Sequence, residues 1–384
     1  MSTMQPLTND PLSSYVPHSG LSIPIVTILD REGRILEDQQ RAVVRFCIQD
    51  GRGADILFAV GTNGEWDRID NAKRQQAARI IVEECRRVSE REKIRPVEAW
   101  IGVTAHTRAE TLENLEYSIA LNADAAVIAP LSITDVDDVV ELVTRDLDAV
   151  FARAGKMIPV FLYDNADIAA PGKPQHLHTR DVKQMSQLPY VRGIKVTASK
   201  TELGNYTRAA SHFKLAHEFV IYAGNAHLIF DLFSPPDGVA ATAKHYWNRY
   251  LTGHSLPYGV VAGPANAMPR EWQRAWQWCR KQDIEQMPRY AKALEEFRDA
   301  CSFTRSGVAY VAMIACLKAA LAEFGVISSD AVANGTPELS GDERRIFADR
   351  FQRLRDKWAR VLEPEWLSQY DGAAGERVRA NQHG

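Results

Sequence analysis

Residues 97–129 read VEAWIGVTAHTRAETLENLEYSIALNADAAVIA, a stretch in which short apolar runs flank a segment of helical period. The runs Val97–Val103 and Ala125–Ala129 lack a strict apolar–polar alternation, which is typical of strands buried on both faces. Between them, Thr107–Leu121 has a helical pattern, and Thr107 is a residue type favoured at a helix N-cap. We therefore predict a strand–helix–strand unit of a parallel sheet.

Units of this kind recur along most of the chain. Further helices are expected at Leu36–Asp50, Asp70–Ser89 and Val136–Ala154, with Asp70 as a second N-cap. Eight strand candidates predict an α/β fold, a (β/α)8 TIM barrel rather than an open doubly wound sheet. No GxGxxG motif follows the first run, which also disfavours a dinucleotide-binding sheet. The eight apolar runs are Ile23–Leu29, Ile56–Val60, Val97–Val103, Ala125–Ala129, Ile158–Tyr163, Val191–Val196, Phe219–Ala223 and Tyr258–Ala262.

The expected domain organisation is one barrel with extensions at both ends. We place an irregular arm at residues 1–20, the barrel at 21–270 and C-terminal helices at 271–362, followed by a flexible tail at 363–384. An insertion at about 233–257 interrupts the last repeat with two prolines and an aromatic cluster. The Trp272, Trp276 and Trp278 side chains are expected to pack one helix face on the barrel or on a neighbouring subunit. The three expected C-terminal helices are Arg270–Ala300, Ser306–Phe324, which we expect to be buried, and Gly341–Leu362.

Composition excludes several classes of protein. The chain has 384 residues, 46 Lys and Arg against 49 Asp and Glu, and a net charge of −3, which disfavours an electrostatic nucleic-acid binder. The longest apolar run, Val308–Leu317, is about half of the roughly 20 residues that a membrane span needs. The N-terminus lacks the pattern of a signal peptide, and five scattered cysteines form no CxxC pair. We expect a cytoplasmic protein with no metal, no nucleic-acid partner and no membrane partner.

Lys195 is the most informative residue, because it lies within the sixth apolar run. In a TIM barrel the catalytic groups stand at the C-terminal ends of the strands. An amine that points into the barrel loses water, which lowers its pKa and makes it a nucleophile able to form a Schiff base with a carbonyl. The alternative interpretation is a lysine at the strand end paired with a carboxylate.

Two further strand ends carry polar groups. Tyr163 ends the fifth run, where its phenol would be able to move protons near an imine, although a tyrosine there is often only packing. The second run is followed by Gly61-Thr62-Asn63-Gly64-Glu65, whose glycines, hydroxyl and backbone N–H groups suit a small carboxylate. The same sequence is also a good ordinary turn.

In this order, the motifs resemble those of the dihydrodipicolinate synthase and N-acetylneuraminate lyase family of class I, pyruvate-handling aldolases. The matching stretches are Gly61–Glu65 (G-[ST]-T-G-E), Tyr163-Asp164-Asn165 (Y-N-x-P) and Gly193-Ile194-Lys195 (G-[IL]-K). The last strand, Gly259-Val260-Val261, with Asn266 and Pro269 after it, is also similar. The resemblance extends from about Leu21 to Phe324.

The resemblance implies a barrel enzyme that needs no cofactor and forms a homo-oligomer, a dimer or a tetramer. It implies Lys195 as the Schiff-base lysine and Tyr163 as the proton-relay phenol. Thr62 and Asn63 would hold the carboxylate of pyruvate or another small-molecule 2-oxo acid. The remaining implied substrate-binding residues are Thr197, Gly224, Asn225 and His227.

The departures from the family pattern bear on the reaction. Asn63 replaces the family's second threonine, and an amide cannot relay a proton as a hydroxyl does. Ala129-Pro130-Leu131-Ser132 lacks the tyrosine that the synthases place there, and Ala166-Asp167-Ile168 lacks their proline and arginine. These losses disfavour dihydrodipicolinate synthase activity itself. Lys195-Val196-Thr197-Ala198 is closer to the lyase branch, which suggests a keto-deoxy sugar acid, although Ala226 and His227 replace that branch's acidic pair.

Two other hypotheses stay open. A barrel that has lost turnover would be a sensor or a structural partner. A metal-dependent enzyme would use His176 and His178 with Glu65, Asp67 and Asp70, but the histidines are expected in a loop away from any strand end.

Overall fold

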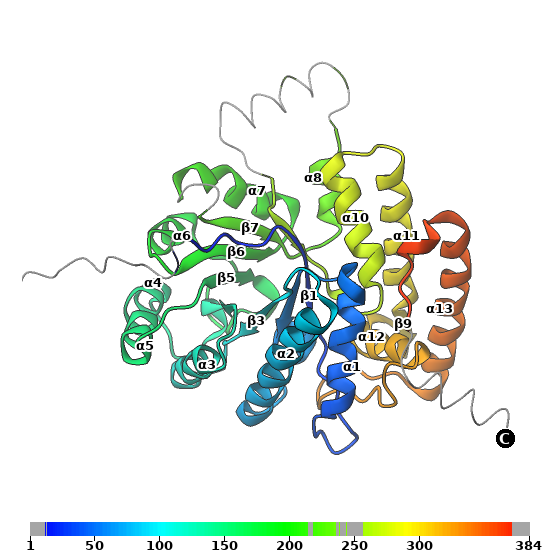
Figure 1. Ribbon diagram of the computed structural model, residues 1–384, viewed down its shortest axis with the longest axis horizontal. Coiled ribbons are helices and arrows are strands. Elements are labelled where there is room, and N and C mark those ends of the chain that lie inside the picture. Colours follow the sequence, from blue (N-terminus) through cyan, green and yellow to red (C-terminus); the bar gives the residue numbers. More distant parts are fainter. Residues whose placement is uncertain are drawn as a thin grey trace, which may run out of the picture.

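The computed structural model describes residues 12, 14–213, 218–235, 238, 243 and 256–370. Eight parallel strands form a closed barrel in which each strand pairs with the next and β8 pairs with β1 (Figure 1). The predicted TIM barrel is therefore confirmed. The strands are β1 Gly20–Pro24, β2 Ile56–Ala59, β3 Glu98–Gly102, β4 Ala125–Ile128, β5 Val160–Asn165, β6 Val191–Thr197, β7 Val220–Ala223 and β8 Gly259–Val261.

The helices between the strands follow the predicted segments with a few differences. Asp70 and Thr107 do cap helices, because their side chains accept hydrogen bonds from the backbone N–H groups of Lys73 and Glu110, at 2.9 and 3.3 Å. The helix expected at Val136–Ala154 starts later and contains a π turn, Leu142–Asp146. The helices are α1 Glu37–Ile48, α2 Asn71–Glu92, α3 Arg108–Ala120, α4 Val139–Glu141, α5 Leu147–Ala154, α6 Thr179–Ser186, α7 Lys200–Ala209 and α8 Leu228–Phe233.

The first strand lies earlier than its apolar run suggested. Strand β1 ends at Pro24, and the rest of the predicted run, Ile25–Leu29, continues beyond the sheet as buried loop. Pro24 has no backbone N–H to continue the ladder, which is consistent with a strand that ends there.

The C-terminal segment packs beside β1 and α1 (Figure 1). The single helix expected at Arg270–Ala300 is wrong: it is two helices, because Gln282 takes a left-handed conformation with φ 55° and ends the first. The N-terminal part of the helix expected at Ser306–Phe324 is also wrong, since it forms a hairpin. The elements are α10 Pro269–Lys281, α11 Gln286–Ala300, β9 Ser302–Arg305, β10 Val308–Val311, α12 Met313–Glu323 and α13 Gly341–Val361.

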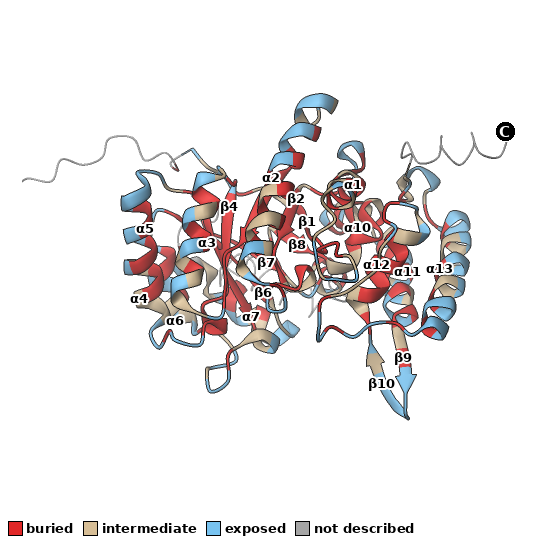
Figure 2. Ribbon diagram, turned by 90° about the horizontal axis from the view of Figure 1, so that it is seen from below, coloured by how far each residue is buried: buried red, intermediate tan, exposed pale blue. Residues whose placement is uncertain are grey.

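Helix α12 is buried between the barrel and α13, as the sequence predicted, whereas the β9–β10 hairpin is largely exposed (Figure 2). On α10, Trp272 and Trp276 are buried and Trp278 is half-buried. Most of the insertion expected at about 233–257, the arm residues before Leu12, and residues 371–384 of the expected tail lie outside the described residues. No described helix combines the length and the apolarity that crossing a membrane requires.

Aromatic side chains fill the inside of the barrel. The Trp100 and Phe161 rings stack with centroids 3.9 Å apart, and Tyr222 packs edge-on against both. At the N-terminal end of the strands, the Glu98 carboxylate accepts hydrogen bonds from Trp100 Nε1 at 2.7 Å and Tyr15 OH at 3.2 Å. These side chains fill the N-terminal end of the barrel, and the candidate catalytic groups lie toward the C-terminal end of the strands.

Candidate active site

Lys195 and Tyr163 lie side by side on neighbouring strands inside the barrel. They are register partners in the β5–β6 pair, and Asn165 and Thr197 form the next inward-facing pair. The Lys195 amine lies 3.7 Å from the centroid of the Tyr163 ring and 5.0 Å from that of Phe58. The two candidate catalytic groups thus share one aromatic-walled end of the barrel.

The environment of Lys195 favours the neutral amine. The residue is 6% exposed, and burial lowers the pKa of its ammonium, which Tyr163 offsets only in part. Within the described part of the chain, no carboxylate forms an ion pair with it. By contrast, the other buried lysine there, Lys318, pairs with Glu65 at 2.6 Å. Of the two, only Lys195 therefore lacks a compensating anion.

Tyr163 has two hydrogen-bonding neighbours. Its phenol lies 3.4 Å from Thr62 Oγ1 and accepts a hydrogen bond from Asn165 Nδ2 at 3.0 Å. Burial alone would raise the pKa of Tyr163, but the charge that Lys195 carries when it is protonated, together with the hydroxyls of Thr62 and Thr197, outweighs burial and lowers it. A phenol of lowered pKa beside an amine is suited to proton transfer.

The loop after β2 presents Thr62 and Asn63 at the same end. Thr62–Gly64 form one 3-10 turn, and the N–H groups of its first residues have no partner within the turn. Val60, which precedes the turn, has φ 54°, a strained conformation for a β-branched residue. Asn63 Nδ2 is buried without a hydrogen-bond partner, so the loop aims an unused donor into the protein.

The residues after β6 and β7 fall into two groups. Thr197 Oγ1 is buried without a partner, and Gly224 is needed beside it, because a Cβ at Gly224 would lie 2.1 Å from that oxygen. Asn225 is exposed. The His227 ring packs on Trp272 and Phe230, its Nε2 is buried without a partner, and burial lowers its pKa. Thr197 and Gly224 therefore adjoin the Lys195 strand, whereas the ring contacts of His227 are with α8 and α10.

Comparison with known proteins gives the same architecture at low sequence identity. No family model matches the chain. A curated 4-hydroxy-tetrahydrodipicolinate synthase of Syntrophotalea carbinolica is 27% identical over 110 residues, 29% of this chain and 34% of that protein. The match thus spans about a third of that relative's length.

Solved structures cover more of the chain. Dihydrodipicolinate synthase from Bacteroides thetaiotaomicron has a TM-score of 0.69 at 18% identity, over 88% of this chain and 99% of that one. Sialic acid aldolase of Ruminococcus gnavus has a TM-score of 0.68 at 16% identity, over 90% and 99%. The chain thus shares its fold with dihydrodipicolinate synthases and N-acetylneuraminate lyases, at low sequence identity.

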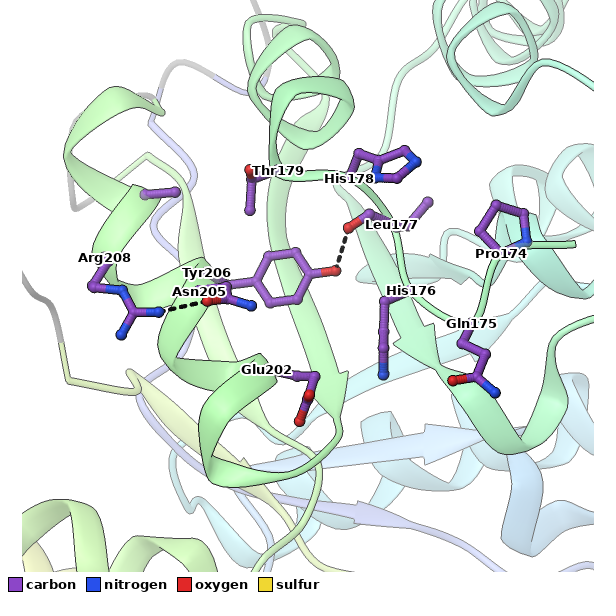
Figure 3. A pocket seen from close by; sticks show the side chains of 11 residues that line it. Pro174, Gln175, His176, Leu177, His178, Thr179, Glu202, Asn205, Tyr206 and Arg208 are labelled. Atoms are coloured by element: carbon purple, nitrogen blue, oxygen red, sulfur yellow. Dashed lines mark hydrogen bonds between the residues drawn. The ribbon is translucent and has the colours of Figure 1, made fainter.

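Asp164 lies between the inward-facing Tyr163 and Asn165 on β5. Its own side chain faces outward and is fully buried. Its carboxylate accepts hydrogen bonds from His176 Nδ1 at 2.8 Å, Tyr206 OH at 2.9 Å and the Leu177 N–H at 3.0 Å. His176 and Tyr206 line a cavity of about 750 Å³ between the β5–α6 loop and α7, on the outside of the barrel (Figure 3). These contacts hold the end of β5, so that Tyr163 and Asn165 face inward.

The same contacts correct the expectation that His176 lies away from any strand end, since it binds the end of β5. In the part of the chain that the structure describes, no group of three or more His, Cys, Asp or Glu is able to hold a metal. Glu65, a candidate metal ligand in that hypothesis, is instead the partner of Lys318.

Sequence reasoning missed two features of this end of the barrel. Asn165 stands two residues after Tyr163 and thus on the same face of β5, which the period of a strand was able to indicate. Phe58 likewise lies on the inner face of β2, edge-on to Tyr163.

Proposed function

We propose that this chain is a class I aldolase or lyase that acts on a 2-oxo acid. Lys195 would attack the keto carbon and form a Schiff base, and Tyr163 would transfer the protons of imine formation and of the enamine step. The observation that carries the proposal is a buried lysine without a carboxylate partner, in contact with a phenol of lowered pKa.

The substrate's carboxylate is assigned to the loop after β2. Thr62 and Asn63 supply backbone N–H groups, and the unpartnered Asn63 amide adds a third donor. Thr197, Gly224, Asn225 and His227 are assigned to the rest of the substrate. Thr197 and His227 each keep a buried polar atom without a partner, which favours a hydroxylated substrate such as a keto-deoxy sugar acid. We also propose a homo-oligomer, as the family resemblance implies.

Borohydride trapping with pyruvate, read by intact mass, tests the proposal. Borohydride reduces a transient imine to a stable amine, so the adduct reports Schiff-base chemistry directly. We expect the adduct in the wild type and in Lys200→Ala, a control at an exposed lysine, and no adduct in Lys195→Ala. Absence of an adduct with pyruvate and with a panel of other 2-oxo acids would refute the enzymatic proposal and leave a non-catalytic barrel.

A further inference from the structure

We propose that Asn165 is a positioning residue for Tyr163. Its side-chain amide donates a hydrogen bond to the phenol oxygen, so that the phenol's own proton is directed toward the reacting atoms. The inference rests on the proposed function for its catalytic meaning. Its structural basis is the hydrogen bond from Asn165 Nδ2 to Tyr163 OH, 3.0 Å long and buried. Both side chains are at most 8% exposed, so water does not readily replace this donor.

The orientation of the Asn165 amide is fixed by a second hydrogen bond. Its Oδ1 accepts from the N–H of Asp167 at 3.2 Å, as the cap of the short turn Ala166–Ile168. Rotating the amide by half a turn would place an NH2 against that N–H and leave the cap unmade. The NH2 group therefore has to face Tyr163.

This arrangement decides what the phenol is able to do. An amide NH2 only donates, so Tyr163 accepts from Asn165 and its own hydrogen has to point elsewhere. The remaining neighbours are Thr62 Oγ1, at the long distance of 3.4 Å, and two groups of β6, the Thr197 hydroxyl and the Lys195 amine. The phenol proton is thereby presented where an imine would form.

The same hydrogen bond stabilises the phenolate. In the proposed reaction, the carbinolamine hydroxyl leaves as water with the phenol's proton, which gives an iminium and a phenolate. The phenolate then takes a proton from C3 of the iminium, which gives the enamine and restores the phenol. A hydrogen bond to the phenol oxygen is stronger when that oxygen is charged. Asn165 therefore favours the phenolate that exists between these two proton transfers.

Asn165 occupies the variable place of the Y-N-x-P motif, so the inference comes from this chain's own contacts. Asn63 replaces the hydroxyl of the family's second threonine, and the synthases' relay tyrosine is missing after β4. Asn165 provides Tyr163 with a hydrogen-bonding partner of a different kind, a fixed donor in place of a relay.

The first arm of the test measures Tyr163 itself, without a substrate. In protein labelled with ¹³C at tyrosine Cζ, the Tyr163 signal is assigned with Tyr163→Phe and titrated in wild type, Asn165→Ser and Asn165→Asp. Both replacements keep an oxygen able to cap the Asp167 N–H and remove the amide NH2 that donates to the phenol. We expect the Tyr163 midpoint to rise by about one pH unit in Asn165→Ser, and further in Asn165→Asp because of its charge.

Asn205→Ser, at an exposed asparagine of α7, is the matched control and should leave the midpoint unchanged. A purely structural role for Asn165 would lower the melting temperature without moving the Tyr163 titration. Equal midpoints in the wild type and both Asn165 variants would overturn the inference.

The second arm uses pyruvate as the probe. In Asn165→Ser, we expect the amount of imine present at equilibrium, as trapped by borohydride, to stay within about two-fold of the wild type. Exchange of the pyruvate methyl hydrogens in D2O should slow by about 10-fold or more. If Asn165→Ser exchanged the pyruvate methyl hydrogens at the wild-type rate, the inference would be contradicted. A wild type without adduct would instead count against the proposed function, and the titration would still decide the role of Asn165.

Discussion

The ion pair between Glu65 and Lys318 joins the candidate carboxylate-binding loop to the C-terminal helices, and breaking it should strongly destabilise the fold. Glu65 ends the Gly61–Glu65 loop, and both side chains are fully buried. One carboxylate oxygen accepts from Lys318 Nζ at 2.6 Å, and the other from the Ala333 N–H and Thr336 Oγ1, both at 2.7 Å. Lys318 also donates to the Ala331 carbonyl at 2.8 Å.

Removing one partner of such a pair leaves the other charge buried. Lys318→Met deletes the ammonium but keeps a side chain of similar length, so the Glu65 carboxylate retains only its two neutral donors. A buried pair broken in this way destabilises a protein by about 3–5 kcal/mol. For a chain of 384 residues, we expect a fall in melting temperature of about 4–6 °C.

Glu65→Gln tests the same pair from the other side. Gln keeps an oxygen for the Ala333 N–H and Thr336 but turns an NH2 toward the Lys318 ammonium, so we expect a loss of similar size. In the double variant, Glu65→Gln with Lys318→Met, no charge is left buried, and the loss should be well below the sum of the two single losses.

Thermal and guanidinium unfolding of the four proteins measure this cycle. Because Thr62 and Asn63 lie in the same loop as Glu65, the single variants should also give less pyruvate adduct at a given concentration. A melting temperature of Lys318→Met within about 1 °C of the wild type, or strictly additive losses, would refute the reasoning.

Three further predictions concern the titratable groups inside the barrel. Tyr163→Phe should keep the equilibrium level of pyruvate adduct but slow exchange of the pyruvate methyl hydrogens by about 100-fold or more, measured by NMR; unchanged exchange would exclude the phenol as proton carrier. Lys195→Met should raise stability at pH 7 by about 1–2 kcal/mol, because it removes an amine that is protonated in the unfolded chain and whose charged form burial disfavours. The wild type regains stability as the pH rises from that lowered pKa to the ordinary value near 10.5, so the advantage in guanidinium unfolding should shrink over that window. Burial raises the pKa of Glu98 from 4.5 to about 7, so its ionisation in the folded state is unfavourable and stability falls as the pH rises between these values. Glu98→Gln should therefore melt above the wild type at pH 8 and not at pH 4, and equal differences at both would contradict this assignment.

The sequence was sufficient for the barrel because strands buried on both faces leave continuous apolar runs. Seven of the eight runs match the observed strands to within a few residues, and β1 alone is displaced, since Ile25–Leu29 is buried without being part of the sheet. Apolar character reports burial rather than strand geometry, so a buried loop next to a strand extends the predicted strand.

Two errors in the C-terminal segment have local causes. Val308–Leu317 is one apolar run, but the chain changes within it from strand β10 to helix α12. The turn Ser306-Gly307, where both residues have positive φ, was the missed signal of a two-residue hairpin loop. The break at Gln282 carries no glycine or proline, so neither of the usual signals for a helix end was present.

The two buried lysines show where sequence patterns stop being informative. Lys195 and Lys318 both interrupt apolar stretches, and either pattern alone allows a reactive amine or one neutralised by a carboxylate. Glu65 is 253 residues from Lys318, so only the fold shows that their charges meet. The fold that pairs Lys318 with a carboxylate places Lys195 against Tyr163 and Phe58, without one. Burial lowers the pKa of both amines, and Glu65 offsets this only in part for Lys318. The difference is that the Lys318 amine is held by the Glu65 carboxylate, whereas no carboxylate in the described part of the chain pairs with Lys195, whose amine is available for chemistry. The position of one glutamate therefore separates a structural lysine from a candidate nucleophile within the same chain.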